Sequence, residues 1–597
     1  MSARKRRVGQ PASGKTAAVA APGPRAATLA LLLFGGLLAV YTLNFRLLGA
    51  GDSFPTRVLP FSVLREGNVD LDEFHWERGP DGRLPYYVHQ SINDPHHIYS
   101  VSTIASALVV TPLYVLPAWW LAANGVGYDD VRARVIIVAM ERFSAASLTA
   151  LSASLLCVVL LRLTTWRWAL VLTVIYALGT STWSIASQAL WAHGLAELCV
   201  VILCAIFLAP EMSRAGAVGA GLAAAVMVAN RPQMIVLAAL ALGFLWVHHR
   251  RHVIAFAAIP AIVGAILFAY NRSVFQHVTG GYGSLGHFDG ALLPGLAGLL
   301  ASPNRGLFVY TPIMLFAVWG AVQVWRVGAP HWLRWLTIGV ALHVFVHAKF
   351  AEWWAGYAYG PRYFTDVLPA LTLFLVYGVT PWCRRWPAQM LVGALALYGV
   401  AVQAIGVYAA DDRWNREPVP LEHKPDRVWD WGDLQIVRAL RNGWRAGELA
   451  PVMLDAFRDR VPARVAPLTV DDLTSVIAIW KLTGDVRRGA PVTALVQITN
   501  RSAVAWAGFS GEGAISSRYL VGLLARFLDR GRQLPGVGDV IILPQNLSPD
   551  ETVYLPLSLT APPVAGQFKL ELRITQVLDG AHGLVGRETR RIWIRVE

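Results

Sequence analysis

The sequence is poor in charged residues, and this scarcity excludes an ordinary soluble protein. Asp, Glu, Lys and Arg make up 15% of the 597 residues, whereas a soluble globular protein carries about 25%. Hydrophobic residues account for 55%, and the mean hydropathy is +0.45. Several apolar runs approach the length of about twenty residues that spans a bilayer as a helix. The composition therefore predicts a polytopic α-helical membrane protein.

Cysteine is also scarce, and common catalytic motifs are missing. The four cysteines, Cys157, Cys199, Cys204 and Cys383, have neither metal-ligand spacing nor a disulfide framework. The sequence lacks an HExxH motif, a P-loop, a Ser-His-Asp order and a tight acidic pair of the kind that holds a divalent metal. We therefore interpret the cysteines as packing residues and predict chemistry without a metal or a cofactor.

The formal net charge of +14 would suggest nucleic acid as the partner of a soluble protein. Here the basic residues recur between apolar runs, where they set the topology of a membrane protein. The 23 tryptophans and 18 tyrosines suit the aromatic belts at membrane interfaces. We therefore expect membrane lipid, and no nucleic acid, as a partner.

The order of the apolar runs predicts eleven crossings. Residues 1–25 form a disordered cytoplasmic tail, and the run 26–45 is a retained anchor. The other predicted crossings are 143–161, 169–185, 190–208, 215–228, 233–247, 253–270, 306–325, 333–346, 363–379 and 390–409. This count places the basic loops, such as 248–252, inside the cell. One more crossing at 100–122 would reverse that pattern, so we expect 100–122 to lie along or dip into the outer surface.

This topology brings polar, aromatic-rich loops together on the outer face of a domain that spans residues 26–410. The first of them is the long loop 46–142. The stretches 183–193, 230–232, 271–305 and 349–362 follow on the same side. We expect the functional site where these loops converge.

The C-terminal region differs in pattern from the rest of the chain. Residues 411–467 are polar and charged, and we interpret them as a connector with a helix at 434–445. Within 468–597, apolar and polar residues alternate in short runs separated by Gly, Pro and Asn, as in 553–559 and 568–575. This alternation predicts an antiparallel β-sandwich, similar to immunoglobulin-like accessory modules, on the periplasmic side. It carries no catalytic constellation, so binding or scaffolding is its expected role.

Asp52 is the main catalytic candidate because it directly follows the first crossing. A helix cap or a topological charge is the plainer interpretation of that position. Arg57 shares the loop, however, and an opposite outer loop carries Glu352 and Arg362. An arginine suits bidentate recognition of a lipid phosphate, although Arg362 at the end of a span could also snorkel to headgroups.

Each of the other candidate residues on the predicted outer face has a structural and a functional interpretation. Trp353 and Tyr359 suit either an aromatic belt or stacking on a sugar ring. His193 opens a span, where a histidine is often structural, yet ionisable groups at membrane depth are functional hypotheses. Arg231 lies between two short spans and is a second candidate for binding lipid phosphate.

These features together resemble the GT-C superfamily of membrane glycosyltransferases, over roughly residues 29–443. The resemblance is closest to bacterial dolichyl-phosphate-mannose mannosyltransferase-like proteins. The motifs that carry it are Gly51-Asp52, Leu190-Trp191-Ala192-His193-Gly194, Ala229-Asn230-Arg231-Pro232, Ser302-Pro303-Asn304-Arg305-Gly306, Gly360-Pro361-Arg362-Tyr363 and Trp429-Asp430-Trp431. Many relatives have a second acidic residue where this chain has Ser53, which leaves Asp52 as the sole base.

The resemblance implies transfer of a sugar from a polyprenyl-phosphate donor to a glycan, lipid or protein acceptor. Asp52 would be the general base, and Arg231 and Arg362 would contact the lipid phosphate. The residue usage, rich in Arg and Ala and poor in Lys, indicates a bacterial inner membrane. A transporter or flippase of lipid-linked saccharides, or a scaffold for glycan assembly, are the alternatives. The sequence shows no obvious inverted repeat of the kind found in transporters.

Overall fold

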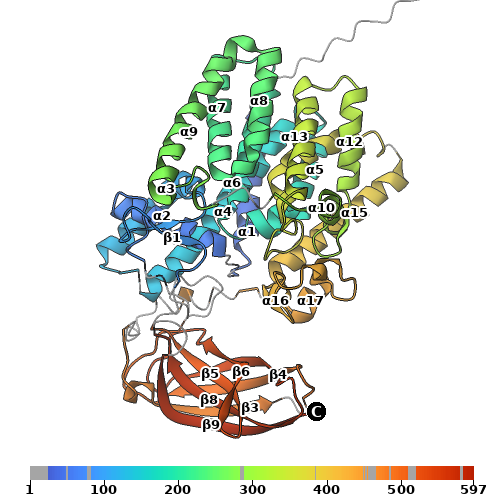
Figure 1. Ribbon diagram of the computed structural model, residues 1–597. Coiled ribbons are helices and arrows are strands. Elements are labelled where there is room, and N and C mark those ends of the chain that lie inside the picture. Colours follow the sequence, from blue (N-terminus) through green and yellow to red (C-terminus); the bar gives the residue numbers. More distant parts are fainter. Residues whose placement is uncertain are drawn as a thin grey trace, which may run out of the picture.

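The computed structural model has a helical part and a C-terminal β-sandwich (Figure 1). It describes residues 24–597 except for 47, 49–50, 75, 77–82, 129, 283–287, 384, 445, 448–449, 451–452, 455–456, 458–465, 483–485, 509–518 and 579–582. Residues 1–23 of the predicted tail therefore lie outside the described residues. The described part confirms a helical membrane protein with an antiparallel β-sandwich at its C-terminal end.

Each predicted crossing corresponds to a helix in the structure. These helices are α1 (Pro24–Thr42), α4 (Val131–Leu160), α5 (Trp166–Gly179), α6 (Ala192–Phe207), α7 (Arg214–Asn230), α8 (Ile235–His248), α9 (Val253–Phe275), α12 (Met314–Arg326), α13 (His331–Ala348), α14 (Leu368–Val379) and α15 (Trp386–Tyr408). Among the described residues, five helices are long and apolar enough to span a membrane: α1, α4, α9, α15 and α3 (Ala105–Ala123). Helix α3 lies in the run 100–122, which was predicted to stay at the outer surface. The number of crossings and the surface position of α3 stay predictions.

Local chemistry places several helix boundaries away from the hydropathy limits. Helix α4 begins twelve residues before the predicted 143, because the Asp130 side chain accepts a hydrogen bond from the Arg132 backbone N–H and caps the helix. The predicted run 306–325 is interrupted at Pro312, which has no backbone N–H to donate. It therefore forms a short α11 (Leu307–Tyr310) ahead of α12.

The loops predicted to lie on the outer face contain short elements that sequence periodicity did not reveal. They are the 3-10 helices η1 (Gly51–Ser53) and η7 (Arg362–Val367), the π-helical turn η2 (Thr182–Ala186), the helices α2 (Phe54–Arg65) and α10 (Leu292–Ala301), and the strands β1 (Val88–Gln90) and β2 (Ile98–Ser100). Strands β1 and β2 pair antiparallel, with His89 opposite Tyr99. These elements give the predicted outer face a folded surface.

Two glycines bring α12 and α14 into close contact. A Cβ atom added at Gly320 would lie 1.9 Å from the Phe374 carbonyl oxygen, and one added at Gly378 would lie 1.9 Å from the Phe316 carbonyl oxygen. Small residues at such a crossing let two backbones approach closely, as is typical of helix pairs in membranes. The pair forms a tightly packed support for η7, which leads directly into α14.

The C-terminal sandwich has two antiparallel sheets in its described residues. Strands β3 (Ser475–Leu482), β4 (Pro491–Asn500) and β7 (Thr552–Thr560) form one sheet, and β6 (Arg532–Ile542), β5 (Val521–Asp529), β8 (Gly566–Gln576) and β9 (Leu584–Val596) form the other. The alternation predicted for 553–559 is confirmed, because Val553, Leu555, Leu557 and Leu559 are all buried. Alternate residues of a strand point to opposite faces, so these four pack into the core between the sheets.

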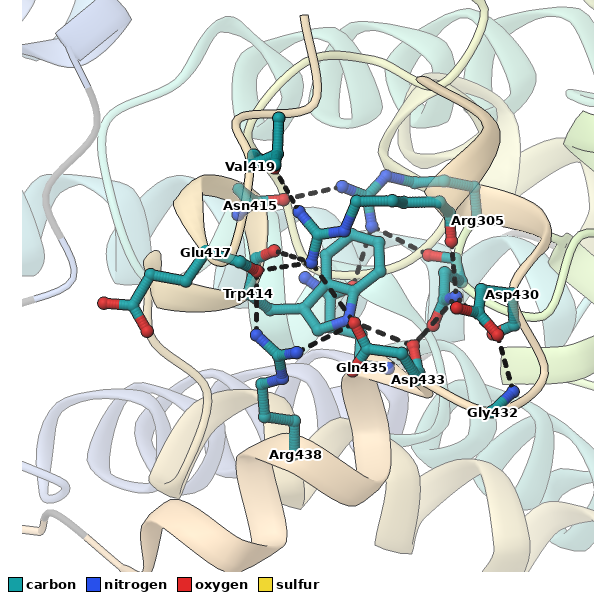
Figure 2. Close-up of polar contacts among 12 residues, drawn as sticks. Arg305, Trp414, Asn415, Glu417, Val419, Asp430, Gly432, Asp433, Gln435 and Arg438 are labelled. Atoms are coloured by element: carbon teal, nitrogen blue, oxygen red, sulfur yellow. Dashed lines mark hydrogen bonds and ion pairs between the residues drawn. The ribbon is translucent and has the colours of Figure 1, made fainter. Parts of the chain in front are cut away.

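Part of the predicted connector packs onto the helical part through Arg305 (Figure 2). Its guanidinium donates to the side-chain oxygens of Gln435 and Asn415, both at 2.8 Å, and lies 5.1 Å from the centre of the Trp414 ring. The predicted helix at 434–445 forms as α17 (Gln435–Asn442). The motif around Arg305 and the motif around Asp430 therefore meet in a structural contact.

Candidate functional site

A cavity of about 580 Å³ opens among the outer loops that were predicted to converge. Its polar lining includes Asp52, Tyr86, Trp191, His193, Arg231 and Arg362. Its apolar lining includes Val101, Ile235, Val236, Val346 and Phe350. Four residues predicted from the sequence, Asp52, His193, Arg231 and Arg362, thus face one space. Such a mixed lining suits an amphiphilic ligand with an anionic group.

Asp52 lies in η1, at the junction between the first helix and α2. One of its carboxylate oxygens accepts from Arg362 Nη2 at 3.2 Å, and the other accepts from the Tyr86 hydroxyl at 3.3 Å. The Asp52 side chain is 43% exposed, so a bound hydroxyl could approach it. The arrangement gives a solvent-accessible carboxylate whose orientation is set by two donors.

Arg362 begins η7, after a turn at Gly360 and Pro361. Gly360 has φ +70°, a left-handed conformation that favours glycine, and a Cβ there would meet the Tyr310 ring. The Arg362 guanidinium lies 4.8 Å from the centre of the Trp191 ring. This stacking leaves the edge of the planar guanidinium for anionic partners, among them Asp52.

A second acid and arginine pair lies deeper in the cavity wall. Arg231 donates from Nε at 3.1 Å and from Nη2 at 2.8 Å to one oxygen of Asp366. His193 Nδ1 lies 2.8 Å from the other oxygen of Asp366. Asp366 is fully buried, while His193 and Arg231 reach the cavity. Asp366 therefore fixes two cavity residues that were predicted to bind substrate.

Hydrogen bonds around Asn230 hold the neighbouring part of the wall together. The Asn230 side-chain oxygen accepts from the Ser106 hydroxyl at 2.7 Å, and its backbone carbonyl accepts from the Thr103 hydroxyl at 2.7 Å. Its side-chain nitrogen donates to the Ala192 carbonyl at 2.5 Å. These bonds join the ends of α3, α6 and α7, so Arg231 and His193 keep a fixed separation.

The structure places the other predicted site residues outside the cavity lining. Arg57 is fully buried and donates to Glu141 at 3.0 Å. Tyr359 is buried, and its hydroxyl donates to the Val402 carbonyl at 2.9 Å. Trp353 packs against Gly298, and Glu352 is exposed. These contacts place Arg57 in a buried ion pair and Tyr359 and Trp353 in packing contacts, and we leave these three and Glu352 out of the proposed site.

Sequence reasoning missed Asp366 and Tyr86. Asp366 is the single acidic residue inside the predicted crossing 363–379, and an ionisable residue within a span is itself a functional signal. Tyr86 had no such signal, because its contact with Asp52 joins residues 34 positions apart across the loop.

The fold and the cavity together define a polytopic helical membrane protein with paired acids and arginines in a cavity at one end. No protein-family model and no curated protein matches the sequence. Among solved structures, the chain is similar to the crystal structure of ArnT from Cupriavidus metallidurans bound to undecaprenyl phosphate. The identity is 14% and the TM-score is 0.41, over 72% of this chain and 71% of that one. So distant a likeness does not define the family or the chemistry of this chain.

Proposed function

We propose that the protein is a membrane glycosyltransferase of the GT-C type. It would transfer a sugar from a polyprenyl-phosphate donor to an acceptor hydroxyl at the periplasmic face of a bacterial inner membrane. The observation that carries the proposal is the pair formed by Asp52 and Arg362, together with Arg231, in the lining of one cavity. One carboxylate and two guanidiniums are the groups that such a transfer requires.

In the proposed reaction Asp52 accepts the proton of the acceptor hydroxyl. The acceptor oxygen attacks the anomeric carbon as the bond from that carbon to the phosphate oxygen breaks, so the configuration inverts. The electron pair of the broken bond stays on the lipid phosphate, whose charge Arg362 and Arg231 stabilise. Positioned base catalysis contributes about 10²–10⁴-fold.

The neighbouring residues support this division of roles. Asp366 takes up two of the five N–H groups of Arg231, and so orients the guanidinium toward the cavity that Arg231 lines. The apolar wall offered by Val236, Val346 and Phe350 suits the isoprenoid chain that carries the phosphate. We propose that the transfer step itself uses no metal and no cofactor, because the arginines supply the positive charge.

The remaining assignments complete the proposal. The C-terminal sandwich would be an immunoglobulin-like module on the periplasmic side, with a binding or scaffolding role. The chain would have its N-terminus in the cytoplasm and cross the membrane eleven times.

The test is release of lipid phosphate by the purified protein. The full chain in detergent is incubated with a radiolabelled polyprenyl-phosphate sugar and a glycan or lipid acceptor extract, and free polyprenyl phosphate is measured. We expect release with the wild type and loss of release with Asp52→Asn. A transporter or flippase would move the donor across a vesicle membrane without cleaving it. Absence of cleavage in every arm, or equal cleavage by Asp52→Asn, would contradict the proposed reaction.

A further inference from the structure

Behind the cavity wall, three buried side chains lie within reach of a common ion. His343 and His347 belong to α13, and Asp366 belongs to η7. One potential ligand atom from each residue lies within 4.8 Å of the other two. All three residues are buried, and neither histidine lines the cavity. The cluster is therefore distinct from the proposed reacting centre at Asp52.

The spacing of the two histidines follows from the helix. Residues four positions apart lie on the same helical face, and the rings of His343 and His347 are 4.1 Å apart between centres. The ring of Tyr363, near the start of η7, packs 4.5 Å from the ring of His347. The local fold thus directs both imidazoles toward the element that carries Asp366.

The hydrogen bonds of the histidines define which nitrogens carry lone pairs. His343 Nε2 lies 3.0 Å from the Tyr363 carbonyl, so that nitrogen is the donor and Nδ1 keeps the lone pair. His347 Nδ1 lies 2.9 Å from the His343 carbonyl, so Nε2 keeps the lone pair. Metal-binding histidines typically donate their other N–H to a carbonyl or a carboxylate in this way.

One of these lone pairs has no protein partner. His347 Nε2 is buried and accepts no hydrogen bond within the described residues. Buried polar atoms are almost always paired, so this nitrogen indicates a partner that the polypeptide does not supply. It is the second, independent observation that points to a ligand at the cluster.

We propose that His343, His347 and Asp366 bind a divalent transition-metal ion such as Zn²⁺, with water as the fourth ligand. Imidazole nitrogens and carboxylate oxygens are established zinc ligands. Their bond lengths of about 2.0–2.2 Å imply ligand separations of about 3.4 Å in a tetrahedral site. The three side chains would therefore close by roughly an ångström around the ion.

The contacts that Asp366 already makes are compatible with this role. A carboxylate offers about four lone-pair sites, and His193 and Arg231 occupy three hydrogen bonds between them. Because Arg231 balances the charge of Asp366 and both imidazoles are neutral, the charge of the ion has no counter-ion within the cluster. A phosphate in the adjacent cavity would supply one, so phosphate and ion should strengthen each other's binding.

The ion would join α13 to η7, the element that begins with Arg362. Its role would be structural, because it lies behind the wall and away from the proposed base. This site goes beyond the proposed function, and either proposal can fail without the other.

The test is metal binding by the full chain in detergent. Protein stripped with chelator is dialysed against Zn²⁺ or Co²⁺, and bound metal is measured by elemental mass spectrometry and by the visible absorption of Co²⁺. We expect one ion per chain with a tetrahedral Co²⁺ spectrum. Inorganic phosphate should increase the affinity.

Two conservative variants separate metal ligation from hydrogen bonding. His347→Asn retains a donor near the Nδ1 position and removes the Nε2 ligand, whereas His343→Gln retains a donor near Nε2 and removes the Nδ1 ligand. Each should weaken binding at least about tenfold, since even the loss of outer contacts costs 10–100-fold. Zn²⁺ should raise the unfolding temperature of the wild type and leave that of His347→Asn unchanged, which also shows whether the variant is folded.

The control is His97→Gln, because His97 forms, with the buried Asp70 and the exposed Asp72, the other described group that could hold a metal. This variant should keep the ion. The proposal is overturned if the wild type binds no ion, if binding follows His97, or if the His343 and His347 variants bind metal as tightly as the wild type.

Discussion

Two carboxylates lie at different depths beside the same cavity, Asp52 in its lining and Asp366 behind its wall, and each is paired with an arginine. Asp52 meets Arg362 through a single ion-pair contact at 3.2 Å, and its side chain is 43% exposed. Asp366 accepts hydrogen bonds from Arg231 and His193 and is fully buried. A pair of Asp and Arg therefore occurs once with an exposed carboxylate and once with a buried one.

The difference fits the proposed role of Asp52 as the reacting base and a holding role for Asp366, which fixes its neighbours in place. An exposed carboxylate with lone pairs toward solvent can accept a proton from an incoming hydroxyl. A buried carboxylate that neutralises an arginine is costly to remove, because its partner would be left charged and unpaired in the interior. The comparison therefore predicts that changes at Asp52 affect turnover and that changes at Asp366 affect folding stability.

The largest expected effect is that of Asp52→Asn on catalysis. Asparagine keeps the size of the side chain but cannot act as the base, so turnover should fall about 10²–10⁴-fold. Single-turnover release of polyprenyl phosphate measures the change. The matched control is Glu66→Gln, which alters an exposed carboxylate on the same outer loop and should retain activity. Equal losses in the two variants would mean that Asp52 has no special role.

Asp366→Asn should have the largest effect on stability. Removing one partner of a buried ion pair costs about 3–5 kcal/mol, whereas an exposed pair such as that of Asp52 contributes about 0–1 kcal/mol. Denaturant unfolding in detergent should therefore separate Asp366→Asn from Asp52→Asn. Adding Arg231→Gln to Asp366→Asn should recover part of the loss, because the unpaired charge is removed. Equal stability of Asp366→Asn and wild type would refute the holding role.

Arg362→Ala should weaken donor binding. A hydrogen bond to a charged group contributes about 1.5–3 kcal/mol, so loss of the guanidinium should raise the KM for the lipid-phosphate donor roughly 10- to 150-fold. Arg362→Lys keeps the charge and loses the planar stacking on Trp191, and should lie between the wild type and the alanine variant. An unchanged donor KM with Arg362→Ala would exclude this arginine as the phosphate ligand.

The smallest effect is expected at His97, an exposed residue of the outer loop. A hydrogen bond to Asp72 raises the pKa of His97, and the charges of Asp72, Asp70 and Asp94 add to this. Because the folded-state pKa is raised, the stabilisation is fully present below the unfolded value of about 6.5 and is lost as the pH rises through the raised value.

Hydrogen exchange of the β1–β2 hairpin measures this dependence. Once corrected for the intrinsic rate, the protection of the hairpin should decrease as the pH rises, and His97→Gln should abolish the trend. Protection that is independent of pH in the wild type would show that His97 does not stabilise the loop.

Much of the fold was predictable because bilayer-length runs and strand alternation are strong signals. The alternation of the chain between the two sides of the membrane predicted that four residues would converge. Counting the crossings places Asp52, His193, Arg231 and Arg362 at the same end of the helices. Internal breaks such as the one at Pro312 were less visible, since hydropathy continues through a proline.

The functions of individual charged residues were harder to predict, because they depend on distant partners. Arg57 resembled a ligand in sequence, yet it pairs with Glu141, 84 residues away. Tyr359 resembled a stacking surface, yet its ring fills the helical interior. Asp366 was obscured by the apolar run around it. In each case the burial of the side chain and its interaction partner decide the role, and the neighbouring sequence reveals neither.

The crossing of α12 and α14 through Gly320 and Gly378 has a consequence for substrate entry. Two backbones in such contact cannot slide past each other without collision, so the pair moves as one block, and η7 moves with it. The proposed lipid donor would therefore enter beside a fixed wall at η7, along the apolar residues Ile235 and Val236 of α8 that line the cavity. A bulkier residue at Gly320 would push α12 and α14 apart and weaken this support of η7.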